Sequence, residues 1–293
     1  MTDTQDPTAS AGAPAEASPA APTLPPRGTR GRRQHSLWRI RGDLAMGWKI
    51  ALGAAGVVIV LGTWWLGAMA IDNPSILPTP PDTLRALGEL WTDGVLTTDL
   101  WASIRRILIG YGISMAIGIV VGISIGSFAS IEAATEAPIG FLRYIPASAL
   151  TPVFLLWLGI GESPKVWLIV VGTVFFNILM VADVARSVPR ELLNAAYTLG
   201  AGRGTVLSRV IMRHSVPGMI DVARINLAAA WLMLVVAELL AAQEGLAFQI
   251  VMAQRFRAVD TMFALLIVFG VIGIVSDLGL RWLRNVSSPW ARP

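Results

Sequence analysis

The stretch SIRRILIGYGISMAIGIVVGISIG, residues 103–126, decides the fold class, because beyond Arg105 and Arg106 it carries no charged residue. A helix needs about 20 consecutive apolar residues to cross about 30 Å of hydrocarbon. Comparable runs recur along the chain and predict six spans: 46–70, 103–127, 137–158, 165–183, 218–242 and 261–284. We therefore expect an all-α, polytopic helical membrane protein.

The composition of the chain agrees with this class. Hydrophobic residues make up 54% of the 293 residues, the mean hydropathy is +0.63 and only 14% are charged, whereas about a quarter are charged in soluble domains. The chain has no cysteine and only two histidines, His35 and His214, which are far apart. We therefore expect no disulfide, no metal site and no bound cofactor.

The first 44 residues differ from the rest of the chain. They are rich in Pro, Ala and Arg, with six arginines between residues 27 and 41, so they predict a disordered tail that buries no core. The transmembrane permease domain is expected over 45–285, and 286–293 form a short second tail. The first span is read as a retained anchor, because the tail before it is unlike the short charged region of a signal peptide.

The distribution of Lys and Arg predicts the orientation. Six spans put both termini on one side, and placing the N-terminus inside leaves most Lys and Arg residues on that side. We expect a plasma (inner) membrane protein with cytoplasmic N- and C-termini, in contact with the lipid bilayer. The net charge of +4 is then explained by the excess of Lys and Arg on the cytoplasmic side of a membrane protein, and no nucleic-acid partner is expected.

The polar stretch ELLNAAYTLGAGRGTVLSRVIMRHS, residues 191–215, separates two apolar spans and would face the cytoplasm. An apolar face recurs at helical spacing over Leu192, Ala195, Ala196 and Leu199. Gly200 is expected to end this helix, and Thr205 to cap a second short helix before the span that starts near Ser215 and Pro217. Two short helices on the membrane surface predict a docking site for a partner; an ordinary cytosolic loop is the alternative.

This stretch resembles the "EAA" loop of binding-protein-dependent ABC importer permeases. Asn194, Ala195, Ala196 and Gly200 stand at the spacing of the E-A-A triplet and its glycine, and Val210, Met212 and Arg213 stand where I, L and P are usual. Asn194 replaces the Glu and Arg213 replaces the Pro. The resemblance extends over 76–285, through ILPTPPDTLRAL, SIRRILIGYGISMAIGIVVGISIG, FLRYIPASALTPVFLLWLGIGESPKVWLI and WLMLVVAELLAAQEGLAF. These stretches are similar to the nitrate/sulfonate/taurine branch of the family.

The resemblance implies a six-helix type I ABC importer permease of the methionine-importer-like fold. It also implies four kinds of partner or solute: a cytoplasmic ABC ATPase dimer, a second permease copy (a homodimer), an extracytoplasmic substrate-binding protein, and a small nitrate-, sulfonate- or taurine-like anion. Related permeases serve other solutes, including pyrimidine precursors and bicarbonate. The loop at 187–215 becomes the coupling helix that docks on the ATPase, and its expected contact residues are Glu191, Asn194, Ala195, Ala196, Gly200, Arg203, Val210 and Arg213.

Polar residues inside the spans are candidates for the translocation path. They are Arg143, Tyr144, Asn177, Arg224, Trp231 and Glu238. Arg224, Trp231 and Glu238 are seven residues apart and share one helix face. Arg224 and Glu238 lie near opposite ends of their span, so side chains that reach the membrane surface are the competing interpretation.

Small residues recur every four positions in the second span, at Gly110, Ser114, Gly118, Gly122 and Gly126. This spacing lets helices approach closely, and Gly118, Gly122 and Gly126 are assigned to helix packing. The G-x-S-x-G match at 122–126 lies within an apolar helix and not at the strand-to-helix turn of a hydrolase, so it is read as accidental.

The chain contains no P-loop motif for ATP. Its two lysines, Lys49 and Lys165, are followed by Ile and Val, whereas a P-loop needs Gly-Lys-Ser/Thr. We expect no catalytic residue and no enzymatic activity, with ATP hydrolysis in a separate subunit. The alternative is an ion-coupled secondary transporter with Glu238 as the ion carrier, whose transport would survive ATP depletion.

Overall fold

The computed structural model describes residues 44–241 and 243–289, and within these ranges it contains helices and no strand. The predicted N-terminal tail, apart from its last residue, and the final residues 290–293 lie outside the described ranges. The all-α fold class is confirmed. The elements are α1 (Met46–Ile71), α2 (Pro80–Thr92), α3 (Val95–Ser127), α4 (Ala129–Leu142), η1 (Ala147–Leu150), α5 (Thr151–Leu158), α6 (Glu162–Arg186), α7 (Arg190–Thr198), α8 (Arg203–Thr205), η2 (Val206–Ile211), α9 (Met212–Ala241), α10 (Leu246–Arg255) and α11 (Val259–Ser287).

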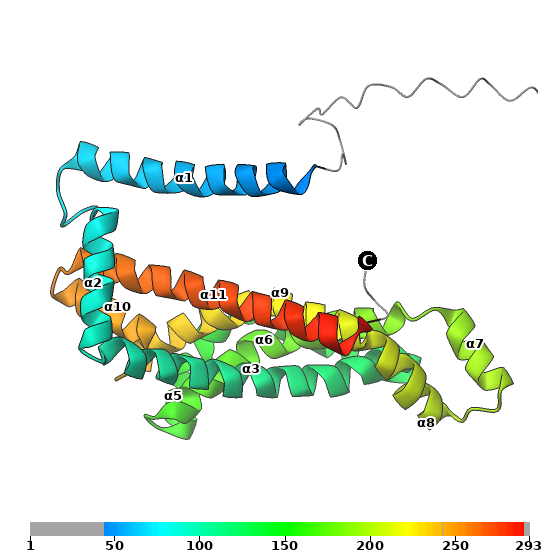
Figure 1. Cartoon of the computed structure of the whole chain (residues 1–293). Coiled ribbons are helices and arrows are strands. Elements are labelled where there is room, and N and C mark those ends of the chain that lie inside the picture. The colour runs from blue at the N-terminus through cyan, green and yellow to red at the C-terminus, as the bar shows by residue number, and fades with distance from the viewer. Residues whose placement is uncertain (1–43, 242, 290–293) are drawn as a thin grey trace, which may run out of the picture. The chain divides into compact units, whose positions relative to one another are not determined.

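Five continuous helical segments are long and apolar enough to cross a membrane, and the bent pair Ala129–Leu142 and Ala147–Leu158 is a sixth candidate. The described residues form two compact units that divide between Val57 and Val58. The second unit, from residue 58 onward, contains every site discussed below. We call its two ends the α7 end and the α10 end (Figure 1).

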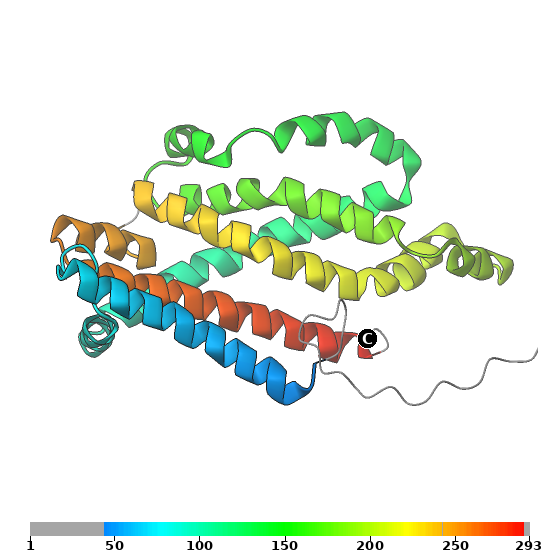
Figure 2. The ribbon, with the colours of Figure 1, turned by 90° about the horizontal axis from the view of Figure 1, so that it is seen from above.

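Helices α3 and α6 lie side by side through the second unit (Figure 1, Figure 2). The glycines of α3 make this approach possible. A Cβ added at Gly122 would lie 2.7 Å from the Ile178 carbonyl oxygen, and one at Gly126 would lie 2.5 Å from that of Ala182. A Cβ at Gly118 would meet the Asn177 side chain at 2.8 Å. The three glycines assigned to packing thus face α6 at backbone contact distance.

The third predicted span, 137–158, is wrong as one continuous helix. Helix α4 begins earlier, at Ala129, and ends at Leu142, and the chain bends by 78° before η1 and α5. Pro146 explains the break, because proline lacks an N–H donor and its ring disfavours helical geometry at the preceding residue. Figure 2 shows this bent segment along one side of α6.

The start of the fifth span also differs from the prediction. The second short helix expected after the glycine turn is continuous with the span, and one helical run extends from Arg203 to Leu239. Gly202, not Thr205, is its N-cap. The run passes through a π-helical segment at Val206–Ile211 and continues past Pro217. Val206 and Ile211 are buried in the core at the α7 end, so packing keeps the helix intact where the sequence signals suggested a new start.

Candidate functional site

Arg106 is the centre of a charged cluster at the α10 end. Its side chain is 1% exposed and its guanidinium donates to three carboxylates, those of Glu162, Glu238 and, at 3.3 Å, Glu244. Nε and Nη2 donate to Glu162 at 2.6 and 2.8 Å, and Nη1 donates to Glu238 at 2.8 Å. Nη1 also donates to the Glu244 carbonyl oxygen at 2.8 Å. A buried arginine with this many charge-assisted hydrogen bonds fixes α3, α6 and α9 to one another.

The Glu238 carboxylate is fully occupied within this cluster. Oε1 accepts from Ser103 at 2.6 Å as well as from Arg106, and Oε2 accepts from the Ala247 N–H at 2.9 Å. Gly245 lies directly against this carboxylate at φ +124°, so no side chain fits there. Glu238 therefore fixes the start of α10 to α9, an arrangement unlike the open carboxylate that an ion carrier needs.

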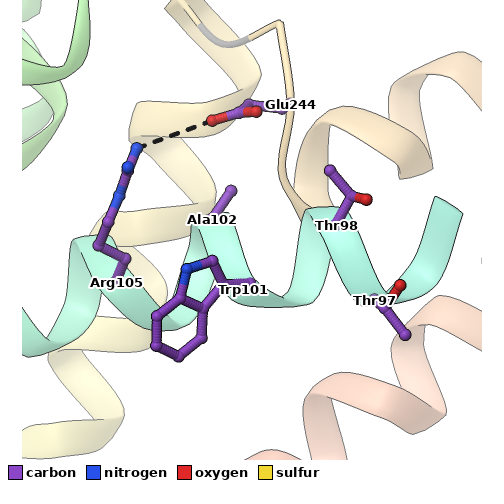
Figure 3. Close-up of a pocket in the computed structure, with 6 residues that line it drawn as sticks. All are labelled: Thr97, Thr98, Trp101, Ala102, Arg105 and Glu244. Atoms are coloured by element: carbon purple, nitrogen blue, oxygen red, sulfur yellow. Dashed lines mark ion pairs between the residues drawn. The ribbon is translucent and has the colours of Figure 1, made fainter. Parts of the chain in front are cut away.

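The outer part of the cluster is open to solvent. Lys165 donates to Glu162 at 2.6 Å, and Arg105 lies 3.7 Å from Glu162 and 3.8 Å from Glu244. Figure 3 shows the Arg105–Glu244 pair beside an open depression of about 330 Å³. The Arg105 pairs are partly exposed and add little stability of their own, whereas the Lys165 side chain is buried beside Glu162.

Sequence reasoning did not single out Arg106 as a site residue, although the predicted span 103–127 includes it. Helix α3 begins at Val95, earlier than predicted, which places both arginines well inside the helix. The signal was a polar face: Asp99, Ser103, Arg106, Gly110 and Ser114 fall at i, i+4, i+7, i+11 and i+15. Glu162 is brought to Arg106 from a distant part of the chain, and no spacing in the sequence indicates it.

A second polar layer lies deeper between the same helices. Ser114 accepts from Thr173 and from Asn177, each at 2.8 Å, and Asn226 donates to the Asn177 side-chain oxygen Oδ1 at 2.8 Å. All four residues are buried. Asn177, a candidate path residue, is thus engaged in hydrogen bonds among α3, α6 and α9, as is usual for polar side chains between membrane helices.

Arg224 lies in an ion-pair network between α9 and α11. Its Nε is 2.8 Å from Asp277, and its Nη1 is 3.5 Å from Asp221. Arg281 pairs with Asp277 at 2.8 Å, and Arg284 Nε lies 3.1 Å from Asp221 without hydrogen-bond alignment. About four helical turns separate this network from Glu238, so the structure does not bring these two candidates together.

Trp231 lies between Arg224 and Glu238 on the same helix. Its ring packs edge-to-face against that of Phe269 in α11, with the two ring centroids 6.0 Å apart. Its buried Nε1 finds no hydrogen-bond partner among the described residues.

Arg143 and Tyr144 occupy the break between α4 and α5. Arg143 Nη2 donates to the Tyr144 hydroxyl at 3.0 Å, and the guanidinium lies 4.8 Å from the ring centroid. Both side chains are exposed on the single chain. Arg143 and Tyr144 are thus exposed candidates for the translocation path, whereas the candidates Asn177 and Glu238 are buried.

The loop at the α7 end presents an uncovered apolar face. Gly200 has φ +79°, and the Gly200 and Ala201 N–H groups bond to the carbonyl oxygens of Tyr197 and Ala196. This is a Schellman motif, so Gly200 ends α7 as predicted. Leu193 and Ala196 pack against the core, whereas Leu192 and Leu199 are exposed, Leu199 by 88%.

The other residues assigned to coupling spread over the same loop. Glu191, Asn194, Ala195 and Arg203 are exposed, Val210 is half-buried against the core, and Arg213 is exposed near the start of α9. Within the described residues no three His, Cys, Asp or Glu side chains gather as a metal site would require.

Comparisons with known proteins assign this helical arrangement to a family. Residues 114–285 match the family model described as "Binding-protein-dependent transport system inner membrane component". A probable ABC transporter permease protein of Brucella melitensis biotype 1 is 34% identical over 241 residues, covering 82% of this chain and 97% of that protein. The taurine transport system permease protein TauC of Escherichia coli K12 is 32% identical, covering 83% and 90%.

A solved structure supports the fold. The MetNI methionine ABC transporter, in an inward-facing conformation, superposes with a TM-score of 0.60 at 17% identity, over 67% of this chain and 97% of the matched chain. The family match favours an ABC importer over the ion-coupled transporter that the sequence left open. The chain belongs to the binding-protein-dependent transport system inner membrane components, the permease subunits of ABC importers.

Proposed function

We propose that this chain forms the translocation path for a small sulfonate-like anion and is driven by a separate cytoplasmic ATPase that docks on α7. The observation that carries the coupling part is the uncovered apolar face of α7. A short helix that its own chain leaves exposed at Leu192 and Leu199 is suited to bury that face in a groove of a partner. The substrate class is supported by the taurine and aliphatic sulfonate transport named for relatives.

The partners follow from the family. A working importer contains two ATPases, a second permease, here a second copy of this chain, and an extracytoplasmic binding protein. In the inner membrane, with both termini in the cytoplasm, α7 faces the side where ATP is present. A hollow of about 240 Å³ beside α7, lined in part by Phe128, Tyr197 and Arg203, offers a place for an ATPase side chain.

The helical run from Arg203 to Leu239 gives the proposal a mechanical basis. It begins beside the glycine turn of the loop and ends next to Glu238, which is tied to Arg106. A displacement imposed on α7 by the ATPase therefore has a continuous helix through which to reach the opposite end. The π-helical segment at Val206–Ile211 lies in this run, and such segments often occur at functional sites.

Leu199→Asp tests the coupling part. Leu199 has almost no contact within its own chain, so the change is expected to leave the melting temperature unaltered and to abolish copurification of the ATPase. ATP-driven uptake should fall by at least about tenfold, because a charge replaces an apolar side chain in the contact. Leu84→Asp, at an exposed leucine of α2, is the matched control and should retain the ATPase. Normal association and uptake by the Leu199 variant would remove the basis of the docking assignment.

A further inference from the structure

The break between α4 and α5 lies about half-way along the bundle. Gly172 of α6 marks its depth, because a Cβ on Gly172 would lie 3.4 Å from the Cβ of Ala147, directly after the break. Gly172 is ten residues from the first residue of α6, or about 15 Å along the helix. Helix α6 is itself a candidate span, so Arg143 and Tyr144, next to this level, lie near the middle of the membrane.

The two side chains at the break are directed away from their own chain. Tyr144 is 74% exposed, and Arg143 is exposed with the tyrosine as its neighbour. In the described part of the chain no carboxylate lies within ion-pair distance of Arg143. This contrasts with Arg106 and Arg224, which both have carboxylate partners.

An arginine without a countercharge at this depth cannot face lipid without a large cost. Charged side chains at the centre of a membrane span face the protein interior or a water-filled cavity. The exposed side of the break is therefore the wall of an aqueous path, which a second copy of the permease would close from the other side.

We propose that Arg143, held by Tyr144, is the residue in this path that contacts the negatively charged group of the transported solute. The Tyr144 ring covers the guanidinium and its hydroxyl takes one Nη2 donor, which leaves other N–H donors free for an oxyanion. This inference rests on the proposed function and deepens it, because it assigns the substrate class to a residue: anions, including sulfonates, and not neutral or cationic solutes.

The natural absence of cysteine allows a direct test in membranes containing the whole transporter. The Tyr144→Cys variant is treated with two methanethiosulfonate reagents, one carrying a negatively charged ethylsulfonate group and one a positively charged ethyltrimethylammonium group. The rate at which each reagent modifies the cysteine is divided by its rate with a free thiol in solution, which removes the difference in intrinsic reactivity. Both reagents should react, and the sulfonate should be favoured on the order of tenfold through the nearby positive charge. Adding Arg143→Gln should abolish the preference for the sulfonate reagent but leave the thiol reactive. Adding Arg143→Lys should retain the preference, because the positive charge remains. Val271→Cys, 53% exposed near the middle of α11 among apolar neighbours, is the control without a charge.

The outcomes separate this inference from the proposed function. If neither reagent modifies the Tyr144→Cys variant, the placement in the path is overturned, and a preference that Arg143→Gln leaves intact would overturn the role of Arg143. Labelling needs no ATPase. If labelling follows the expected pattern but uptake persists after ATP depletion, the proposed ATP-driven function is contradicted. The assignment of Arg143 to the anion path would still stand.

Discussion

Arg106→Met should strongly reduce the amount of folded permease in the membrane. The substitution keeps the side-chain bulk but leaves the Glu238 carboxylate, which is buried and tied to Arg106 at 2.8 Å, without its countercharge. Breaking a buried ion pair on one side costs about 3–5 kcal/mol, a large part of the roughly 5–15 kcal/mol by which native proteins are stable. The melting temperature of the detergent-purified complex and the level of membrane-inserted protein report the loss.

The neighbouring arginine is the matched control. Arg105 is 47% exposed and lies 3.7 and 3.8 Å from its two carboxylates, so Arg105→Met should cost less than about 1 kcal/mol. Equal melting temperatures for the two variants would mean that the Arg106 cluster does not hold α3, α6 and α9 together. A double variant, Arg106→Met with Glu238→Gln, should recover part of the loss because it removes the unpaired charge.

Gly126→Ala is the second change with a large expected effect. The added Cβ would lie 2.5 Å from the Ala182 carbonyl oxygen and 2.6 Å from the Ala185 Cβ, so α3 and α6 must separate along their closest contact. Overpacking of this kind costs about 1–3 kcal/mol, and we expect a lower melting temperature and weaker uptake.

The same substitution at Gly112 should not destabilise the protein. A Cβ at Gly112 meets nothing within 4 Å, and alanine favours helix over glycine by up to about 1 kcal/mol. Gly112→Ala should therefore leave the melting temperature unchanged or raise it. If both substitutions lowered the melting temperature equally, the role assigned to the α3 glycines in close packing against α6 would be wrong.

Features that depend on neighbouring residues in the sequence were predictable. The small residues at intervals of four indicated the packing face of α3, and Gly200 indicated the end of α7, because helix spacing and glycine conformation are local properties. The overall class followed from the lengths of the apolar runs. The resemblance of the loop around Asn194 to Gly200, together with that of four other stretches over 76–285, indicated the family, which the comparisons confirm.

Features that depend on distant parts of the chain were missed. Arg106 meets Glu162 and Glu238 across 56 and 132 residues, and no local pattern carries such a pairing. The bend at Pro146 was missed because apolar residues lie on both sides of it, so the mean hydropathy of the stretch joined two helices into one span. The expected break before Pro217 failed for the opposite reason: the local signals were present, but packing of Val206 and Ile211 kept the helix continuous.

We propose that ATP hydrolysis in a separate subunit reaches this chain through α7, and photo-crosslinking from position 199 tests this most directly. A photoreactive amino acid replaces Leu199 in cells that perform uptake, and the products are identified by mass spectrometry. We expect one dominant product that joins this chain to a nucleotide-hydrolysing protein of the cytoplasm. A probe at position 199 that membrane-impermeant reagents reach from outside, or that captures only lipid while uptake continues, would contradict it.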